Sequence, residues 1–320
     1  MRAPRQAVEI VFDHATKRYP GRAAPAVDDL SLSIPAGEIC CLVGPSGGGK
    51  TTAMKLVNRL VELTSGDVRI DGRSVKALDQ TELRRGIGYV IQQVGLFPHM
   101  TIAENIATVP RLLGWSKAEI ALRVDELLDL VELPAVDYRD RYASQVSGGE
   151  RQRVGLARAL AADPPVMLMD EPFGALDPIT RTRLQKELLR IQGEVRKTII
   201  FVTHDIDEAI LIGDRVAILR EGGVLAQYAT PEELLAHPAD DFVARFVGVD
   251  RGLRRLSLRR LAELDLEPAN GAVGPLLDAD TTLRDALSAM LNAGARAVLV
   301  DGEDGRRRVL TLDRLTELLR

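Results

Sequence analysis

The segment Gly44 to Thr51, which reads GPSGGGKT, constrains the fold more than any other part of this chain. The apolar run 39–43 precedes it and a helix-like stretch, 52–63, follows it, so the pattern predicts strand, loop and helix. Glycines let successive backbone N–H groups converge on phosphate oxygens, and the helix N-terminus adds a partial positive charge. We expect Lys50 to neutralise the β- and γ-phosphates of ATP and the Thr51 hydroxyl to hold Mg²⁺. The alternative is a Gly-rich turn without a ligand, and both flanking segments argue against it.

Composition narrows the class of protein. The chain has 320 residues, 46% of them hydrophobic, so it can bury a large core and has room for more than one domain. Its formal charge of -4 means that the chain lacks the excess of positive charge typical of nucleic-acid-binding proteins, so we expect no nucleic-acid partner. No apolar run approaches the roughly 18 residues of a membrane span, and residues 1–6 lack the apolar region of a signal peptide. We therefore expect a cytoplasmic protein.

Helical patterns alternate with apolar strands along the chain. The runs 166–169 and 198–202 are apolar on both faces, and the helix-like stretches 151–161 and 181–190 precede them, which predicts a buried parallel sheet. Apolar residues alternate with polar neighbours in segments 8–12, 68–70 and 216–219. This pattern predicts peripheral antiparallel strands. Cys40 and Cys41 are neighbours in a predicted strand and point to opposite faces, so we expect two core residues and no disulfide.

Polar residues follow both buried strands directly. Asp170 and Glu171 come after one strand and His204 comes after the next, at the edge where α/β folds bind ligands. Asp170 can hold Mg²⁺ through water, Glu171 can polarise an attacking water, and the His204 imidazole can bind the γ-phosphate. An acidic pair after a strand is more often a helix cap, but the phosphate loop favours catalysis here. We expect the other histidines, at positions 14, 99 and 237, to be surface or cap residues.

Together with Ser147-Gly148-Gly149-Glu150, these motifs resemble the ATP-binding subunit of ABC transporters over residues 8–249. The resemblance implies an α/β P-loop NTPase fold: a RecA-like core with an antiparallel β subdomain and a helical subdomain at about 101–146. It makes 1–250 the ATP-binding domain. Ser147 to Glu150 corresponds to the signature motif that contacts ATP held by the opposite subunit, with Val146 in place of Leu and Glu150 in place of Gln. The hydroxyl and glycines that bind phosphate are retained.

The resemblance also assigns roles to single residues. Tyr19 would stack on adenine, although a packed loop aromatic is the alternative, and Gln92 would link Mg²⁺ and lytic water to the membrane subunit. Asp177 would contact the facing subunit. The implied catalytic residues are Glu171, His204 and Gln92, and the implied Mg²⁺ residues are Thr51, Gln92 and Asp170. The implied nucleotide-binding residues are Tyr19, Gly44, Pro45, Ser46, Gly47, Gly48, Gly49, Lys50, Thr51, Thr52, Ser147, Gly148, Gly149, Glu150 and Asp177.

In this family a signature motif does not reach its own phosphate loop, so the resemblance implies a homodimer that sandwiches two ATP molecules. ATP hydrolysis would then drive transmembrane permease subunits, with an extracytoplasmic substrate-binding protein as an indirect partner, from the cytoplasmic face of the membrane. A soluble ABC ATPase of repair or translation is the rival. No long coiled coil interrupts 44–204, and only one ATPase cassette is present, which disfavours that rival. The presence of both Glu171 and His204 disfavours an inactive ATP-binding regulator.

Phrases between the motifs narrow the resemblance further. Segments 88–100, 110–115, 173–181 and 240–243 are similar to the ATPases of glycine betaine, choline and related osmoprotectant importers, a class that includes carnitine and proline betaine. The permease and the binding protein select the substrate, so an importer ATPase for another small solute remains an alternative.

Residues 251–320 form a separate predicted unit. After a basic linker, 251–260, come a helix at 282–292, strands at 297–301 and 307–311 with a turn at 302–305 between them, and a final helix. This pattern resembles a single CBS module, a regulatory fold that usually works in pairs, so pairing across the homodimer is a natural hypothesis. Arg308 and Arg314 replace the Gly and Asp of its nucleotide-binding pattern, with Asp313 one place early, which argues against an adenosine-type ligand. The arginine run 306–308 is either a solvated strand edge or a contact for anionic lipid headgroups.

Overall fold

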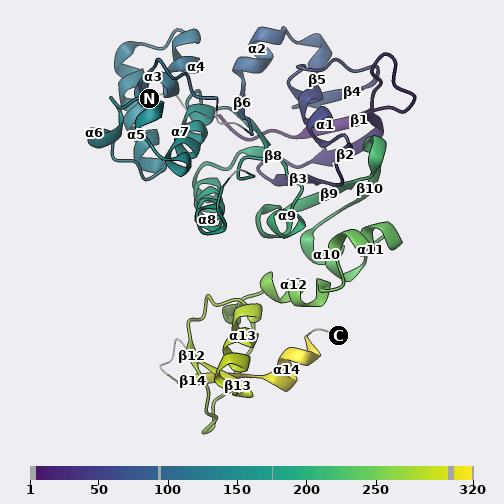
Figure 1. Cartoon of the computed structure of the whole chain (residues 1–320), viewed down its shortest axis with the longest axis vertical. Coiled ribbons are helices and arrows are strands. Elements are labelled where there is room, and N and C mark those ends of the chain that lie inside the picture. Colours follow the sequence, from purple (N-terminus) through teal and green to yellow (C-terminus); the bar gives the residue numbers. More distant parts are fainter. Residues whose placement is uncertain (1–4, 93–94, 175, 302–305, 319–320) are drawn as a thin grey trace. The chain divides into compact units, whose positions relative to one another are not determined.

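The computed structural model describes residues 5–92, 95–174, 176–301 and 306–318. Its internal contacts divide the chain into two compact units, one of residues 1–205 with 212–228 and the other of residues 206–211 with 229–320. Figure 1 labels most of the helices and strands of both units. The contact-based division falls before residue 250, and the domain boundary expected there stays a prediction.

A six-stranded sheet forms the centre of the first unit, in the order β10-β9-β3-β8-β7-β6. Its central strands pair in parallel, with Cys40 of β3 opposite Ile200 of β8. All five residues of β3 and of β8 are buried. On one face, their side chains pack with those of α1 and of the neighbouring antiparallel sheet. The predicted buried parallel sheet is therefore confirmed. Its strands are β3 (Ile39–Val43), β6 (Ile87–Val90), β7 (Val166–Asp170), β8 (Thr198–Val202), β9 (Arg215–Leu219) and β10 (Leu225–Ala229).

The prediction for segment 216–219 was wrong. Instead of a peripheral antiparallel strand, β9 pairs in parallel with β3, with Val216 opposite Cys41. Residues 216–219 are all buried. Ala217 is small but apolar, so the apparent alternation of this strand reflects side-chain size and not a solvent-facing side.

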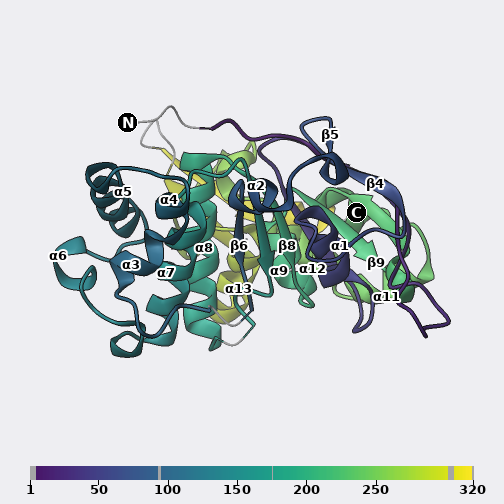
Figure 2. The same ribbon diagram turned by 90° about the horizontal axis from the view of Figure 1, so that it is seen from above.

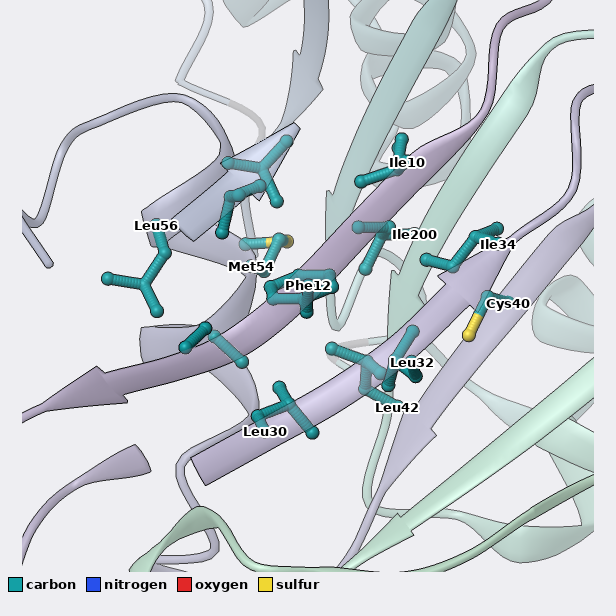
Figure 3. Close-up of a cluster of buried hydrophobic side chains, with 14 of the residues drawn as sticks. Ile10, Phe12, Leu30, Leu32, Ile34, Cys40, Leu42, Met54, Leu56 and Ile200 are labelled. Atoms are coloured by element: carbon teal, nitrogen blue, oxygen red, sulfur yellow. The ribbon is translucent and has the colours of Figure 1, made fainter. Parts of the chain in front are cut away.

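A second, antiparallel sheet packs beside the first in the order β2-β1-β4-β5, which confirms the prediction for segments 8–12 and 68–70. Figure 3 shows the core that it shares with the central sheet: Phe12, Leu30 and Met54 belong to one buried cluster with Leu42 and Cys40, and Met54 lies beside Phe12. Both cysteines are buried and neither forms a disulfide, as expected, and burial raises the pKa of Cys40. The strands are β1 (Ile10–Lys17), β2 (Val27–Ile34), β4 (Ser65–Ile70) and β5 (Arg73–Ser74).

The helix after the phosphate loop, α1 (Lys50–Val57), begins two residues earlier and ends sooner than the predicted 52–63. It ends because Asn58 leaves the helical conformation and Arg59 takes a left-handed one, with φ of 51°. The 3-10 turn η1 (Val75–Ala77) and α2 (Gln80–Arg85) then lead to β6.

The segment predicted as a helical subdomain, at about 101–146, lies on the side of the first unit opposite the antiparallel sheet, as Figures 1 and 2 both show. It contains α3 (Ile102–Ile106), α4 (Thr108–Leu112), α5 (Lys117–Leu130), α6 (Ala135–Tyr138) and the 3-10 turn η2 (Ala143–Gln145), and α7 (Gly148–Leu160) follows it. Capping boxes begin α3, α5 and α7. The remaining elements of the first unit are α8 (Pro178–Val195) and the 3-10 turn η3 (Glu221–Gly223). Helix α9 (Ile206–Ile212) belongs to the second unit except for its last residue.

The second unit carries a four-stranded sheet in the order β11-β14-β13-β12. Strands β13 (Ala297–Asp301) and β14 (Arg307–Thr311) have the predicted bounds, and α13 (Leu283–Ala293) lies within one residue of its prediction. The expected linker was wrong over much of its length, because α12 (Arg251–Ser257) is helical and buries Leu256 in the core. The predicted turn 302–305 lies outside the described residues. The other elements are α10 (Pro231–Ala236), α11 (Asp241–Val247), η4 (Leu261–Glu263), β11 (Glu267–Pro268), β12 (Leu276–Leu277) and α14 (Leu312–Glu317).

Among the residues that the structure describes, no helix is both long and apolar enough to cross a membrane. The resemblance of the second unit to a CBS module stays a prediction.

Candidate active site

The loop between β3 and α1 depends on two glycines that no other residue can replace without strain. Gly44 has φ of 152°, and a Cβ there would lie 2.2 Å from the Leu219 carbonyl oxygen. Gly49 has φ of 75°, and a Cβ there would lie 2.1 Å from the Ala26 carbonyl oxygen. The loop therefore lies directly against the backbone at the end of β9 and before β2.

The helix after the loop leaves hydrogen-bond donors unused. Its first hydrogen bond runs from the Ala53 N–H to the Gly49 carbonyl, at 2.7 Å. The N–H groups of Lys50, Thr51 and Thr52 consequently have no partner within α1. Free N–H groups and the helix dipole at such an end suit a phosphate anion.

Lys50 is 8% exposed and folds back onto the loop. Its Nζ donates to the carbonyls of Gly44 at 2.8 Å and Pro45 at 2.9 Å. Burial lowers its pKa, while the carboxylates of Glu171 and Asp170 act in the opposite direction. The loop thus holds a cation where an incoming phosphate would meet it.

Thr51 and Asp170 provide oxygen ligands at the same edge of the sheet. The Thr51 hydroxyl donates to Asp170 Oδ1 at 2.8 Å. Burial raises the pKa of Asp170, and this hydrogen bond opposes the rise. Burial and the nearby Asp170 charge also raise the pKa of Tyr89 to about 12. A hydroxyl and a carboxylate are hard oxygen donors, so the pair fits Mg²⁺ that is shared with phosphate oxygens.

Glu171 is the meeting point of the predicted catalytic residues. Its Oε2 accepts a hydrogen bond from Gln92 Nε2 at 2.9 Å and lies 3.3 Å from His204 Nδ1. Its backbone is left-handed, with φ of 44°, and its N–H donates to the Val202 carbonyl at 2.9 Å. Strained backbone of this kind persists where surrounding structure holds it, often at functional sites. The structure therefore brings Gln92, Glu171 and His204 together.

Two cavities adjoin the loop. One, of about 440 Å³, is lined by residues 46–52 together with Glu171 and His204. The other, of about 550 Å³, is lined by Tyr19 and shares Ser46, Gly47, Gly49 and Thr52 with the first. Residues 46–52 of the predicted phosphate loop and the predicted base-stacking residue Tyr19 therefore line adjoining spaces, whereas Gly44 and Pro45 line neither. The histidines at 14, 99 and 237 are exposed, as expected.

The wall around Tyr19 contains residues that sequence reasoning missed. Arg22 and Glu221 line the same cavity. The guanidinium carbon of Arg22 lies 6.0 Å from the centre of the Tyr19 ring, and Lys17 Nζ lies 5.0 Å from it. The turn Glu221-Gly222-Gly223 was a visible turn signal, but nothing in the sequence placed it beside Tyr19.

The segment Ser147 to Glu150 lines neither cavity. Ser147 caps α7: its Oγ accepts from the Glu150 N–H at 3.3 Å, and Glu150 Oε2 accepts from the Ser147 N–H at 2.6 Å. Ser147 and Gly148 are exposed, whereas Gly149 is buried. A Cβ at Gly149 would lie 3.1 Å from the Thr180 methyl carbon. The structure thus leaves this segment apart from the loop of its own chain.

Asp177 caps α8. Its carboxylate accepts from the N–H groups of Ile179 at 3.1 Å and Thr180 at 3.0 Å, and hydrogen bonding to Thr180 lowers its pKa. The side chain is exposed, so its cap role leaves room for a further contact. Tyr138 is a further residue that sequence reasoning missed, and its hydroxyl donates to Glu150 Oε1 at 2.5 Å.

Comparisons with known proteins point in one direction. The sequence pattern of the family described as "ABC transporter" matches residues 27–174. The osmoprotectant import ATP-binding protein OsmV of Salmonella typhimurium is 47% identical, over 93% of this chain and 77% of that protein. The glycine betaine uptake system ATP-binding protein YehX of Escherichia coli is also 47% identical, over 93% of this chain and 95% of that protein. The dimeric cassette MJ0796, solved in a post-hydrolysis state with ADP and phosphate, is similar at a TM-score of 0.61 and 34% identity, over 69% of this chain and 98% of that chain.

Proposed function

This chain belongs to the ABC transporter family as an ATP-binding subunit, and we propose that its ATP hydrolysis powers the import of osmoprotectants. The observation that carries the catalytic part is the position of Glu171, which contacts both Gln92 and His204 beside the cavity of the phosphate loop. ATP with Mg²⁺ is the substrate of this family's cassettes.

Each residue of the site has a distinct task in this proposal. The loop N–H groups and Lys50 bind the β- and γ-phosphates, and Tyr19 stacks on adenine. Thr51, Asp170 and Gln92 would hold Mg²⁺, which neutralises charge on the phosphates. His204 donates a hydrogen bond to the γ-phosphate.

Glu171 acts on the attacking water. It accepts a proton as the water oxygen forms a bond to the γ-phosphorus, and the bond from that phosphorus to the β,γ-bridging oxygen breaks. ADP and inorganic phosphate are the products. Gln92 and His204 orient the Glu171 carboxylate through the contacts seen at its Oε2.

We propose that the active unit is a homodimer. The support is the exposure of Ser147 and Gly148, which offer a hydroxyl and helix N–H groups but line no cavity of their own loop. A second chain placed head to tail would bring them to the γ-phosphate, and Asp177 would meet the facing chain. Loss of the γ-phosphate would then remove the contacts that keep the two chains closed.

The partner that uses this motion is a transmembrane permease, with the chain bound peripherally at the cytoplasmic face of the membrane. We place one permease segment in a cavity of about 350 Å³ that is lined by Ile91, Gly95 and Phe97. These residues are close in sequence to Gln92, which is expected to link the catalytic site to the membrane subunit. Arg158 of α7 donates to the Gly95 carbonyl at 2.7 Å, so this cavity is tied to the helix that Ser147 begins. Purification with a multi-span membrane protein tests this partner.

The substrate class rests on relatives whose names specify glycine betaine, choline, carnitine and proline betaine transport. Uptake of labelled betaine, choline and carnitine by cells that lack their own importers, but carry this subunit with the genes beside it, tests the class. Uptake of a different small solute instead would replace it.

One variant tests the catalytic proposal. Glu171→Gln keeps the shape and the contacts of the side chain but cannot accept a proton, so ATP binding should persist while turnover falls by about 100-fold or more. The variant should accumulate as closed dimers with ATP. Near-normal hydrolysis would remove Glu171 from this role.

A further inference from the structure

The signature segment is held by a side chain that comes from a different helix. Tyr138, the last residue of α6, donates its hydroxyl to Glu150 Oε1 at 2.5 Å. The other oxygen of Glu150 accepts from the Ser147 N–H at 2.6 Å. Both oxygens of one carboxylate are therefore engaged, one by the start of α7 and one by α6.

This arrangement fixes which groups Ser147 can offer. Its N–H is used by Glu150, and its Oγ accepts from the Glu150 N–H at 3.3 Å. A serine hydroxyl rotates about its C–O bond, so the same Oγ can donate its proton to a phosphate oxygen while it accepts from the helix. The N–H groups of Gly148 and Gly149, in the first turn of α7, have no partner within the helix.

The arrangement also restrains a charge. Glu150 is an anion three residues after Ser147, which would bind the triphosphate of the partner's ATP. A carboxylate free to move there would repel that triphosphate. Hydrogen bonds from Tyr138 and Ser147 lower the pKa of Glu150 to about 2 and fix where its charge lies. The Arg141 guanidinium carbon lies 4.7 Å from the centre of the Tyr138 ring, a cation–π contact that favours this position of the ring.

We infer that Tyr138 is a positioning residue for ATP-dependent dimerisation: through Glu150 it holds Ser147 and the start of α7 in the geometry that binds the partner's γ-phosphate. This inference rests on the proposed homodimer. It concerns the signature side of the site only, so it predicts no effect on nucleotide binding by the chain's own loop.

The test uses Glu171→Gln as the background, because that variant should trap the closed dimer. Tyr138→Phe removes only the hydroxyl. Two copies of the contact are lost per dimer, so a loss of about threefold at each site raises the dimer dissociation constant about tenfold. Sedimentation equilibrium with ATP measures that constant. The affinity of the monomer for ATP and its melting temperature should stay close to those of the background.

Two controls separate positioning from general packing. Tyr142→Phe removes the hydroxyl of an exposed tyrosine nearby and should leave the dissociation constant unchanged. Glu150→Gln keeps an oxygen for the Ser147 N–H and an amide that can donate to Tyr138, so dimerisation should be retained within about twofold. Since a glutamine side chain carries no charge, adding Tyr138→Phe to the Glu150→Gln variant releases no anion. Tyr138→Phe should therefore cost clearly less there than it does beside the native Glu150.

Three results would overturn the inference: Tyr138→Phe dimerises like its background, it weakens dimerisation equally with and without Glu150→Gln, or it weakens ATP binding by the monomer as much as dimerisation. Failure of Glu171→Gln itself to dimerise with ATP would be a different result, and it would overturn the proposed homodimer together with this inference.

Discussion

The hydroxyl of Thr51, at the start of α1, donates a hydrogen bond to the carboxylate of Asp170, at the end of β7, with 2.8 Å between the two oxygens. The residues are 119 positions apart in sequence. Their contact joins the phosphate loop to the strand that carries Glu171, and it places two oxygen ligands where Mg²⁺ and the phosphates would meet.

Thr51→Val should therefore reduce the contribution of Mg²⁺ to ATP binding. Valine has the shape of threonine but no hydroxyl, and it leaves Asp170 without this donor. We expect the gain in ATP affinity on adding Mg²⁺ to fall by about tenfold. Titrations with Mg²⁺ and with a chelator measure that gain. Thr51→Ser keeps the hydroxyl and should behave like the native chain; an equal loss in both variants would contradict this role.

Gly49→Ala should both unfold the loop and abolish nucleotide binding. The new Cβ would lie 2.1 Å from the Ala26 carbonyl oxygen, at φ of 75°. The expected cost in free energy of unfolding is about 2 kcal/mol or more. Gly21→Ala is the matched control, because φ there is 76° but nothing lies within 4 Å of the new atom. It should cost about 1 kcal/mol, from the backbone conformation alone. Equal costs in urea unfolding would show that the close approach does not matter.

Glu150 should give the first unit a defined acid dependence. Hydrogen bonds from Tyr138 and Ser147 lower its pKa from 4.5 to about 2. Because the folded-state pKa is the lower one, the stabilisation is complete above pH 4.5 and is lost as the pH falls through about 2. The difference in stability between the native chain and Glu150→Gln should shrink across that window. Urea unfolding at several pH values measures it, and a difference that does not change with pH would contradict the prediction.

Lys197 should support stability without a role in catalysis. It is 2% exposed, and its Nζ contacts Asp163 at 2.7 Å and the Arg5 carbonyl at 2.9 Å. It precedes β8, at the end of the strand opposite to His204. Lys197→Ala leaves the Asp163 carboxylate without this cation and should cost about 3 kcal/mol, with KM for ATP unchanged. Asp28→Ala breaks an exposed pair with Arg18 and should cost less than about 1 kcal/mol. Similar losses in free energy of unfolding for the two variants would contradict the claim that burial makes the Lys197 ion pair the more important one.

The sequence predicted those parts of the fold that local patterns encode. The phosphate loop, β3 and β8 were evident because glycine spacing and apolar runs report backbone and burial directly. Strand β9 was misplaced because Ala217 and Arg215 made a central strand resemble an edge. The helical start of the expected linker was missed because its arginines obscured the buried Leu256.

The site was predictable in its residue types but not in its contacts. Asp170, Glu171 and His204 follow buried strands, so their shared edge could be inferred. The hydrogen bond between Tyr138 and Glu150 could not, because it joins residues of two separate helices, α6 and α7. A helix of four residues, such as α6, is also too short to give a periodic signal.

In the proposed homodimer, each ATP site combines the phosphate loop of one chain with Ser147 of the other. Mixing two inactive variants tests this shared site most directly. Lys50→Ala disables the phosphate loop and Ser147→Arg blocks the signature segment, so either variant alone should hydrolyse almost no ATP. In a mixed dimer one site is built from the native loop of one chain and the native Ser147 of the other. An equal mixture should therefore recover about a quarter of the native rate, since half the dimers are mixed and each has one intact site. A rate no higher than that of the separate variants would contradict a site shared between two chains.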